Sequence, residues 1–151
     1  MTSDFFIRLA QVTEQKALEA LQWRASLRNA GDREALLANS DAIEIPIEQI
    51  ARGQVFVADA AGLIVGFAAI LSRQDGDSEL DALFVEPDKW RHGVGQTLID
   101  HCTGAALKNG SAALHVTGNP HAAGFYLACG FELLGNTQTR FGVGLLMRKI
   151  L

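Results

Sequence analysis

A glycine loop in the middle of the chain carries the residues whose types and spacing best suit chemistry. Gly93 and Gly95 follow an apolar, strand-like run that breaks at Pro87, and a helical pattern follows them, all within LDALFVEPDKWRHGVGQTLI (80–99). A helix that begins behind glycines presents backbone N–H groups without intrahelical partners, together with the positive end of the helix dipole. A glycine also lets a ligand approach the backbone closely, because no Cβ stands in the way. The segment predicts a phosphate or pyrophosphate site, against the plainer alternative of a glycine-rich helix start without a ligand.

Two carboxylates lie on the predicted strand that leads to this loop. Glu79 and Asp81 are two residues apart, so their side chains should share one face of the strand. A carboxylate in such a place can accept a proton from a reacting group. The alternative is a pair of exposed strand charges opposite a basic neighbour, and the sequence leaves both interpretations open.

The cysteines and histidines give no metal motif. Cys102 and Cys129 form neither a disulfide framework nor a paired metal motif, and no two of the four histidines have metal-ligand spacing. The chain also lacks the nucleophile-elbow sequence of Ser/His/Asp enzymes. We therefore expect no metal, and two reduced cysteines that serve in packing.

Alternating strand and helix patterns describe the elements that must position these residues. Seven strands are expected, over 5–9, 55–59, 63–71, 78–85, 112–117, 131–140 and 144–150. Helices are expected over 13–29 with Thr13 as N-cap, in interrupted pieces over 30–53, from the glycine loop to Lys108, and over 121–129. The run LIVGFAAIL (63–71) is apolar on both faces, so it should lie inside the sheet. The order strand, long helix, strand predicts a parallel pair of strands joined by a crossover.

Composition limits the class of protein and of partner. The chain has 151 residues, is 48% hydrophobic, and carries a net charge of −4 with a pI of about 5.5. These values suit one globular domain over 1–151 and argue against nucleic acid or an anionic membrane as the main partner. No apolar run reaches the ~18 residues of a membrane span, and the N-terminus lacks a signal pattern. We expect a cytoplasmic protein.

The order of elements and two motifs resemble the GNAT superfamily of acyl-CoA-dependent N-acyltransferases over essentially the whole chain. FVEPDKWRHGVGQTLI (84–99) is similar to the family's Gln/Arg-x-x-Gly-x-Gly/Ala loop, and NPHAAGFYLACGF (119–131) is similar to its Asn…Ala…Phe-Tyr…Gly-Phe segment. The resemblance implies an α/β fold of the α+β type: a mixed, mostly antiparallel sheet of about seven strands with helices on both faces. The sequence departs from the family at Trp90, where Gln or Arg is usual. This departure weakens the motif match more than the chemistry, because backbone amides do most of the pyrophosphate binding in the family.

The resemblance also implies acetyl-CoA as cosubstrate and a set of residues that hold it. The backbone of the strand end is expected to pair with the pantetheine amides, in the manner of an added strand. The expected cofactor-binding residues are Leu83, Phe84 and Val85 of the strand, Arg91, His92, Gly93, Val94, Gly95, Gln96 and Thr97 of the loop and helix start, and Asn119, Phe125 and Tyr126 of the second motif.

Three catalytic residues are implied in the same way. Some family members carry a Glu fourteen residues before the first loop glycine, which selects Glu79 as the base, with Asp81 as the runner-up that alternatively orients the substrate ammonium. The family uses a tyrosine of the second motif to protonate the leaving thiolate, and Tyr126 is the only tyrosine in the chain. A packing role for Tyr126 is the alternative.

The sequence thus predicts an N-acetyltransferase that moves acetyl from acetyl-CoA to a primary amine of a small molecule or peptide by direct attack. A non-catalytic acyl-CoA-binding sensor with the same fold is the alternative. We expect the acceptor pocket to be shaped by residues 30–53 and 135–144. Within the second segment, Arg140 either closes this pocket, makes a contact between subunits of an oligomer, or serves as a surface charge. A homodimer is a further expectation for an isolated domain of this kind.

Overall fold

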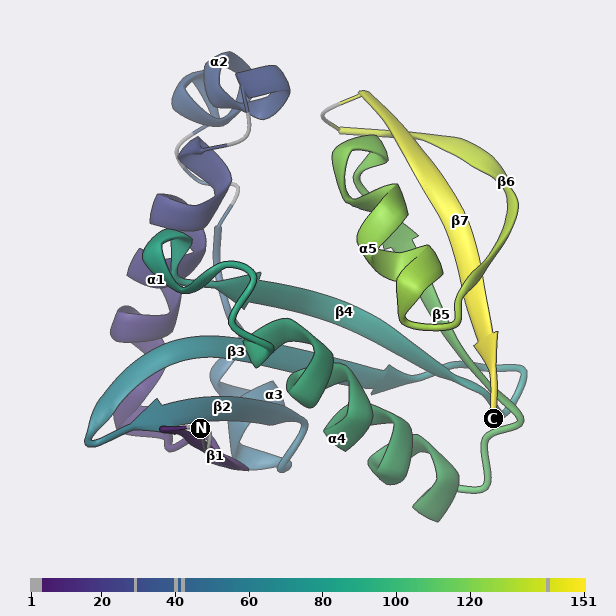
Figure 1. Ribbon diagram of the computed structural model, residues 1–151, viewed down its shortest axis with the longest axis horizontal. Coiled ribbons are helices and arrows are strands. Elements are labelled where there is room, and N and C mark those ends of the chain that lie inside the picture. The colour runs from purple at the N-terminus through teal and green to yellow at the C-terminus, as the bar shows by residue number, and fades with distance from the viewer. Residues whose placement is uncertain (1–3, 29, 40, 42, 141) are drawn as a thin grey trace.

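One seven-stranded sheet organises the computed structural model, which describes residues 4–28, 30–39, 41, 43–140 and 142–151 (Figure 1). The strand order is β1-β2-β3-β4-β5-β7-β6. Every neighbouring pair is antiparallel except β4 and β5, which are parallel and joined through α4, as the sequence predicts. The strands are β1 Phe6–Leu9, β2 Val55–Ala60, β3 Leu63–Ser72, β4 Ser78–Val85, β5 Ala113–Gly118, β6 Glu132–Thr139 and β7 Gly142–Ile150. The predicted fold class is confirmed.

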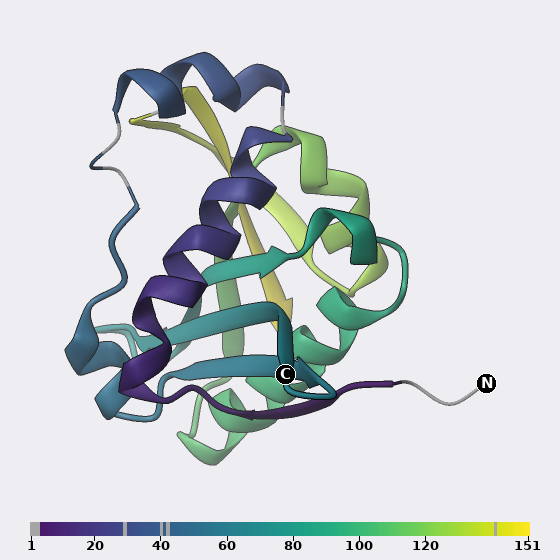
Figure 2. The ribbon, with the colours of Figure 1, turned by 90° about the vertical axis from the view of Figure 1, so that its left-hand side faces the viewer.

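Helices cover both faces of this sheet, and each face has its own core (Figures 1 and 2). The α-helices are α1 Gln15–Leu27, α2 Ala30–Ala38, α3 Ile47–Ala51, α4 Val94–Lys108 and α5 Ala123–Ala128, and the 3₁₀ turns are η1 Val12–Glu14, η2 Pro87–Lys89 and η3 Pro120–Ala122. On one face Leu18 and Leu21 of α1 pack with Val57 and Phe67. None of the helices in the described part of the chain combines the length and apolar character needed to cross a membrane.

The predicted apolar faces are the ones that the fold buries. Val94, Leu98, Ile99, Cys102 and Ala106 of α4 are all buried, at the spacing of one helical face. Strand β3 lies between β2 and β4 and is buried over residues 65–70, which confirms its interior place. The glycine within it, Gly66, marks a close approach, since a Cβ there would lie 2.9 Å from a Val94 methyl group.

Two irregularities of β4 create the space for a site. First, β4 pairs with β5 only over Ser78–Leu80, although β4 continues to Val85 along β3, so the two parallel strands diverge beyond Leu80. Second, the pairing of β3 with β4 jumps from Ile70↔Leu80 to Ala69↔Ala82, which makes Asp81 the extra residue of a β-bulge. A bulge changes the direction in which side chains point, so the alternation of side chains between the two faces of β4 is interrupted at Asp81.

Some predicted boundaries differ from the observed ones. Thr13 is not the N-cap of the first helix. The N-cap of α1 is Glu14, and Gln11 is the N-cap of the η1 turn before it. The Glu14 side chain accepts a hydrogen bond from the Gln11 N–H at 2.8 Å in a capping box. Glu14 also holds Arg8 of β1, which sequence spacing does not reveal. The predicted helix end at Asn29 and residue Phe141 of the last turn lie outside the described residues.

Candidate active site

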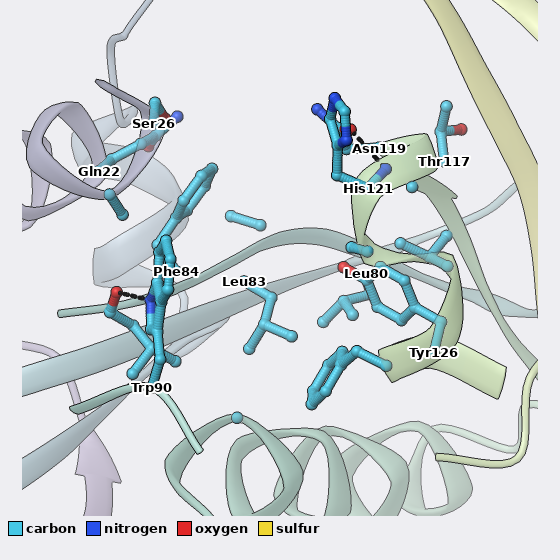
Figure 3. A pocket seen from close by; sticks show the side chains of 18 of the residues that line it. Gln22, Ser26, Leu80, Leu83, Phe84, Trp90, Thr117, Asn119, His121 and Tyr126 are labelled. Atoms are coloured by element: carbon cyan, nitrogen blue, oxygen red, sulfur yellow. Dashed lines mark hydrogen bonds between the residues drawn. The ribbon is translucent and has the colours of Figure 1, made fainter. Parts of the chain in front are cut away.

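A cleft of about 950 Å³ opens where β4 and β5 diverge (Figure 3). Its floor comes from β4, and one side comes from α1, from which Gln22 and Ser26 point towards it. The opposite side comes from the end of β5, η3 and α5, with Thr117, Asn119 and Tyr126. A concave site of this size, where a parallel strand pair separates, is the usual position of a ligand pocket in an α/β sheet.

Most of the site residues predicted from the sequence meet in this cleft. Those that line it are Asp81, Leu83, Phe84, Val85, Arg91, Gly93, Val94, Gly95, Gln96, Asn119, Phe125 and Tyr126. Glu79, His92 and Thr97 are not among the lining residues. The hydroxyl of Thr97 donates to the Gly93 carbonyl at 2.8 Å, so it serves the helix start rather than a ligand.

The N-terminus of α4 offers backbone donors at one end of the cleft. The first hydrogen bond of the helix runs from the Thr97 N–H to the Gly93 carbonyl, so the N–H groups of residues 94–96 come before the helical ladder. Arg91 and Gly93 have φ values of 67° and 83°, in the left-handed region. For Arg91 this conformation is strained, and such strain is typical of ligand-binding loops. This end suits an anion.

Trp90, the position that departs from the family pattern, ties the loop to the strand. Its indole Nε1–H donates to the Val85 carbonyl at 2.8 Å, and its side chain lines the cleft (Figure 3). The Glu86 N–H faces β3, where it donates to the Val65 carbonyl, so the backbone groups of Val85 point away from β3 into the gap. Sequence reasoning did not find this contact, because it depends on the divergence of β5 from β4, which only the structure shows.

The donor set and the close packing at this end fit the CoA portion of acetyl-CoA. A Cβ on Gly95 would lie 3.0 Å from Phe125 Cζ and 3.7 Å from a Val85 methyl group, so a glycine is what lets these three elements meet. The free N–H groups of the first helical turn suit a pyrophosphate, with the Lys89 and Arg91 side chains also in the lining. The diverging edge of β4 suits an amide-bearing chain that pairs like a strand.

Tyr126 stands at the opposite side, buried among aromatic rings. Its ring meets Phe125 and Phe131 edge-on, each with centroids 5.4 Å apart. Gly118 makes room for it, because a Cβ there would lie 3.1 Å from the tyrosine ring. Burial raises the pKa of the Tyr126 hydroxyl to about 12, so the hydroxyl keeps its proton at neutral pH.

The two candidate carboxylates have different surroundings. Arg73 Nη1 lies 3.0 Å from the Glu79 carboxylate, which is the basic neighbour that the plainer interpretation anticipated. Asp81 lines the cleft and accepts a hydrogen bond from Nε2 of Gln49 at 3.3 Å. Gln49 is buried in α3, so it holds the Asp81 carboxylate from behind. The structure therefore places Asp81 in the cleft and Glu79 in an ion pair outside the cleft lining, although the sequence spacing puts both on one face of the strand.

Two further side chains have local partners. Asn119 Oδ1 accepts from the His121 N–H at 2.9 Å, which is the capping contact predicted for it. The Cys129 thiol donates to Oε1 of Gln96 at 3.0 Å, and burial raises its pKa. A thiol that holds its proton is a poor nucleophile, which agrees with a packing role.

One cluster away from the cleft has the composition of a metal site. Within the described residues, ligand atoms of Asp75, Asp77 and His115 lie within 4.8 Å of one another. Asp77 Oδ2 lies 2.9 Å from His115 Nε2, and Asp77 Oδ1 accepts the N–H groups of Ala112 and Ala113 at 3.0 and 3.1 Å. These contacts give Asp77 a structural task, since they fasten the β3–β4 turn to the start of β5.

Comparisons with known proteins agree with this geometry. A family model described as an acetyltransferase (GNAT) domain matches residues 51–133, more than half of the chain. The PaiA N-acetyltransferase of Thermoplasma acidophilum, solved in complex with coenzyme A, has a TM-score of 0.80 at 18% identity, over 99% of this chain and 100% of that one. A GCN5-related N-acetyltransferase of Rhodopseudomonas palustris has a TM-score of 0.77 at 23% identity, over 100% and 98%.

A ribosomal-protein-alanine N-acetyltransferase of Brucella melitensis has a TM-score of 0.73 at 24% identity, over 97% of this chain and 99% of that one. No curated protein sequence matches the chain. At these identities the solved structures establish the fold, whereas the family match rests on the sequence that contains β4, the glycine loop and α5. The chain therefore belongs to the GNAT acetyltransferase family.

Proposed function

We propose that the protein transfers the acetyl group of acetyl-CoA to a primary amine by direct attack, without a covalent enzyme intermediate. One observation carries the proposal. A carboxylate, Asp81, and a protonated phenol, Tyr126, line the same cleft as the donor-rich start of α4. Holding two reactants together in such a cleft supplies much of the rate of a bimolecular reaction.

The binding roles follow from the elements. The N–H groups of Val94, Gly95 and Gln96 hold the pyrophosphate, and the Arg91 side chain adds charge. The β4 edge at residues 83–85 pairs with the pantetheine amides. Phe125 and Asn119 form the wall of the cofactor site on the side of α5 and η3. The Val85 carbonyl already accepts the Trp90 indole N–H, which leaves the Val85 N–H as the backbone donor for the thioester oxygen.

Bound acetyl-CoA supplies the acetyl group as a thioester, whose carbonyl carbon an amine can attack. An alkylamine is mostly protonated at pH 7, so Asp81, directly or through a water molecule, takes its proton and frees the lone pair. Tyr126 gives its hydroxyl proton to the departing sulfur and regains one from solvent. The amine nitrogen loses two protons in all and the sulfur takes one, so one proton is released. Glu79 is the second candidate for the base.

Binding and product formation, measured separately, test this proposal. Calorimetry and thermal shift with sub-millimolar acetyl-CoA should show binding, and a panel of primary amines followed by mass detection should show an acetylated product. If acetyl-CoA produces neither a heat of binding nor a thermal shift, the proposed cofactor site is wrong. Binding without product from any amine would replace the enzyme by a CoA-binding sensor.

A further inference from the structure

The side of the cleft away from α4 has walls with almost no charge. We call it the acceptor half, and its lining residues are Gln22, Ser26, Leu36, Ile43, Asp81, Thr139 and Val143. Among the described residues that line the whole cleft, Asp81, Lys89 and Arg91 carry full charges. Both cations lie on the segment that leads into α4, so Asp81 is the single full charge among the residues of the acceptor half.

The remaining walls of the acceptor half are neutral. Gln22 and Ser26 lie one helical turn apart on α1 and point towards the cleft, beside the ring of Phe84 (Figure 3). Leu36 and Ile43 add apolar surface from α2 and the segment after it. Such walls suit an apolar body with at most one or two hydrogen-bonding groups.

A polar bridge outside the lining of the acceptor half joins two of the segments that form its walls. Arg140, in the turn between β6 and β7, donates through Nη2 to Asn39 Oδ1 at 3.0 Å and lies 3.1 Å from Asp41 Oδ1. The tip of the β6–β7 hairpin lies beside α2 in both views (Figures 1 and 2). The bridge narrows the route for an extended chain, and it matches the charge of Arg140 with that of Asp41.

Resting on the acetyltransferase function proposed above, we propose that the acceptor is a small primary monoamine with a neutral, largely apolar body. Asp81 matches the one ammonium group of such a molecule, and the side chains of α1 and α2 match its body. An α-amino acid would place its carboxylate beside Asp81, without a cation from the acceptor half. A polyamine would bring further ammonium groups that meet no second carboxylate. Binding sites reject ligands whose charges are left unmatched.

Four candidate acceptors test whether the substrate is a primary monoamine with an apolar body. The probes are 2-phenylethylamine, phenylalanine, spermidine and a neutral tripeptide with a free N-terminus, each at saturating acetyl-CoA. We expect kcat/KM for 2-phenylethylamine to exceed that for each of the other three at least about 30-fold. Calorimetry of each probe with the CoA-bound protein should give the same order, which provides a readout that does not depend on turnover.

A charge placed on α1 tests the position of the acceptor directly. Gln22→Glu adds a second carboxylate to the acceptor half and should raise kcat/KM for 1,4-diaminobutane relative to 2-phenylethylamine about tenfold. Lys16→Gln is the matched control, because it changes the net charge by the same −1 on the same helix, at a side chain that is 88% exposed. The control should leave the ratio unchanged. An unchanged ratio in Gln22→Glu would overturn the placement of the acceptor body against α1.

The outcomes separate this inference from the function beneath it. Acetylation that favours phenylalanine, spermidine or the tripeptide overturns the monoamine class and leaves the acetyltransferase standing. Binding of acetyl-CoA without acetylation of any of the four probes overturns the monoamine class, and the acetyltransferase is then decided by the wider panel of primary amines. A preference for 2-phenylethylamine in turnover and in binding supports both.

Discussion

The two ends of the cleft are built by different kinds of contact. At the end beside the start of α4, which we call the cofactor end, the hydrogen bonds that shape the glycine loop join residues close in sequence: Trp90 donates to Val85, and Thr97 donates to Gly93. In and beside the acceptor half, partners are far apart: Gln49 donates to Asp81 across 32 positions, and Arg140 reaches Asp41 across 99 positions. The cofactor end presents a fixed set of backbone donors, which suits a cosubstrate common to a family. The acceptor half depends on how elements far apart in the sequence pack together, which suits an acceptor that differs between members of the family.

The largest expected effect falls on Asp81, the carboxylate of the acceptor half. Asp81→Asn should lower kcat/KM for the amine about 1,000-fold, because the amide keeps the shape but cannot take a proton. The loss should be partly restored at high pH, where more of the amine is already neutral. Steady-state rates between pH 6 and 10, with calorimetry showing unchanged acetyl-CoA affinity, check this prediction.

Glu79→Gln is the matched variant for that experiment. It removes a carboxylate two residues away that pairs with Arg73 and lies outside the cleft lining. We expect a change within about threefold, in line with a partly exposed ion pair. A larger loss from Glu79→Gln than from Asp81→Asn would return the base role to Glu79.

Tyr126→Phe should have the next largest effect. Removal of the hydroxyl should lower kcat about 100-fold with little change in the KM for acetyl-CoA, since the ring still packs against Phe125 and Phe131. Rates at saturating substrates measure this loss. Unaltered turnover would leave Tyr126 with a packing role alone.

The same variant has a pH signature in stability. In the unfolded chain a tyrosine loses its proton near pH 10, whereas burial raises the pKa of folded Tyr126 to about 12. The unfolded state therefore binds fewer protons over this interval, and the free energy of unfolding falls as pH rises from about 10 to about 12. Denaturant unfolding of both proteins should show a steeper fall in the wild type than in Tyr126→Phe.

Gly95→Ala probes the cofactor end alone. Its Cβ would lie 3.0 Å from Phe125 Cζ, so the phenyl ring has to shift and the first turn of α4 moves relative to it. We expect acetyl-CoA binding to weaken about tenfold, as measured by calorimetry. Gly104→Ala is the control on the same helix, because nothing lies within 4 Å of its added Cβ. It should leave binding intact and stabilise the protein by about 0.5–1 kcal/mol.

What the sequence could predict follows the same division. The strand, the glycine loop and the helix at one end of the cleft were predictable because they follow one another within twenty residues, and each local pattern agrees with the next. The buried face of α4 was predictable for the same reason, from its periodicity. The choice between Glu79 and Asp81 was not, because it depends on the bulge in the pairing of β4 with β3 and on Gln49 and Arg73 from other elements. The start of the first helix was not predictable for the same reason, because the capping box of Gln11 and Glu14 at η1 is held in part by Arg8 of β1.

Trp90→Phe tests whether the departure from the family pattern serves the cofactor end. The phenyl ring retains apolar surface but loses the N–H that donates to the Val85 carbonyl at 2.8 Å. A single hydrogen bond at a partly exposed site is worth about 0.5–1.5 kcal/mol, so the KM for acetyl-CoA should rise about threefold to tenfold. The KM for the amine should stay constant. An equal rise in both KM values would mean that the indole organises the whole cleft rather than one end.

The smallest effect on stability is expected beside the acceptor half, at Arg140→Ala. The Arg140 side chain is 51% exposed and that of Asp41 is 82% exposed, so their ion pair should contribute less than about 1 kcal/mol. Selectivity is the sharper readout. Without the bridge to Asn39 and Asp41, the route for an extended acceptor widens, and kcat/KM for the tripeptide should rise about threefold relative to 2-phenylethylamine. Arg140→Lys keeps the charge and part of the reach, so it should fall between the wild type and the alanine variant. A selectivity ratio that is the same in all three proteins would mean that contacts deeper in the acceptor half, at Asp81 and α1, determine the acceptor without help from the bridge.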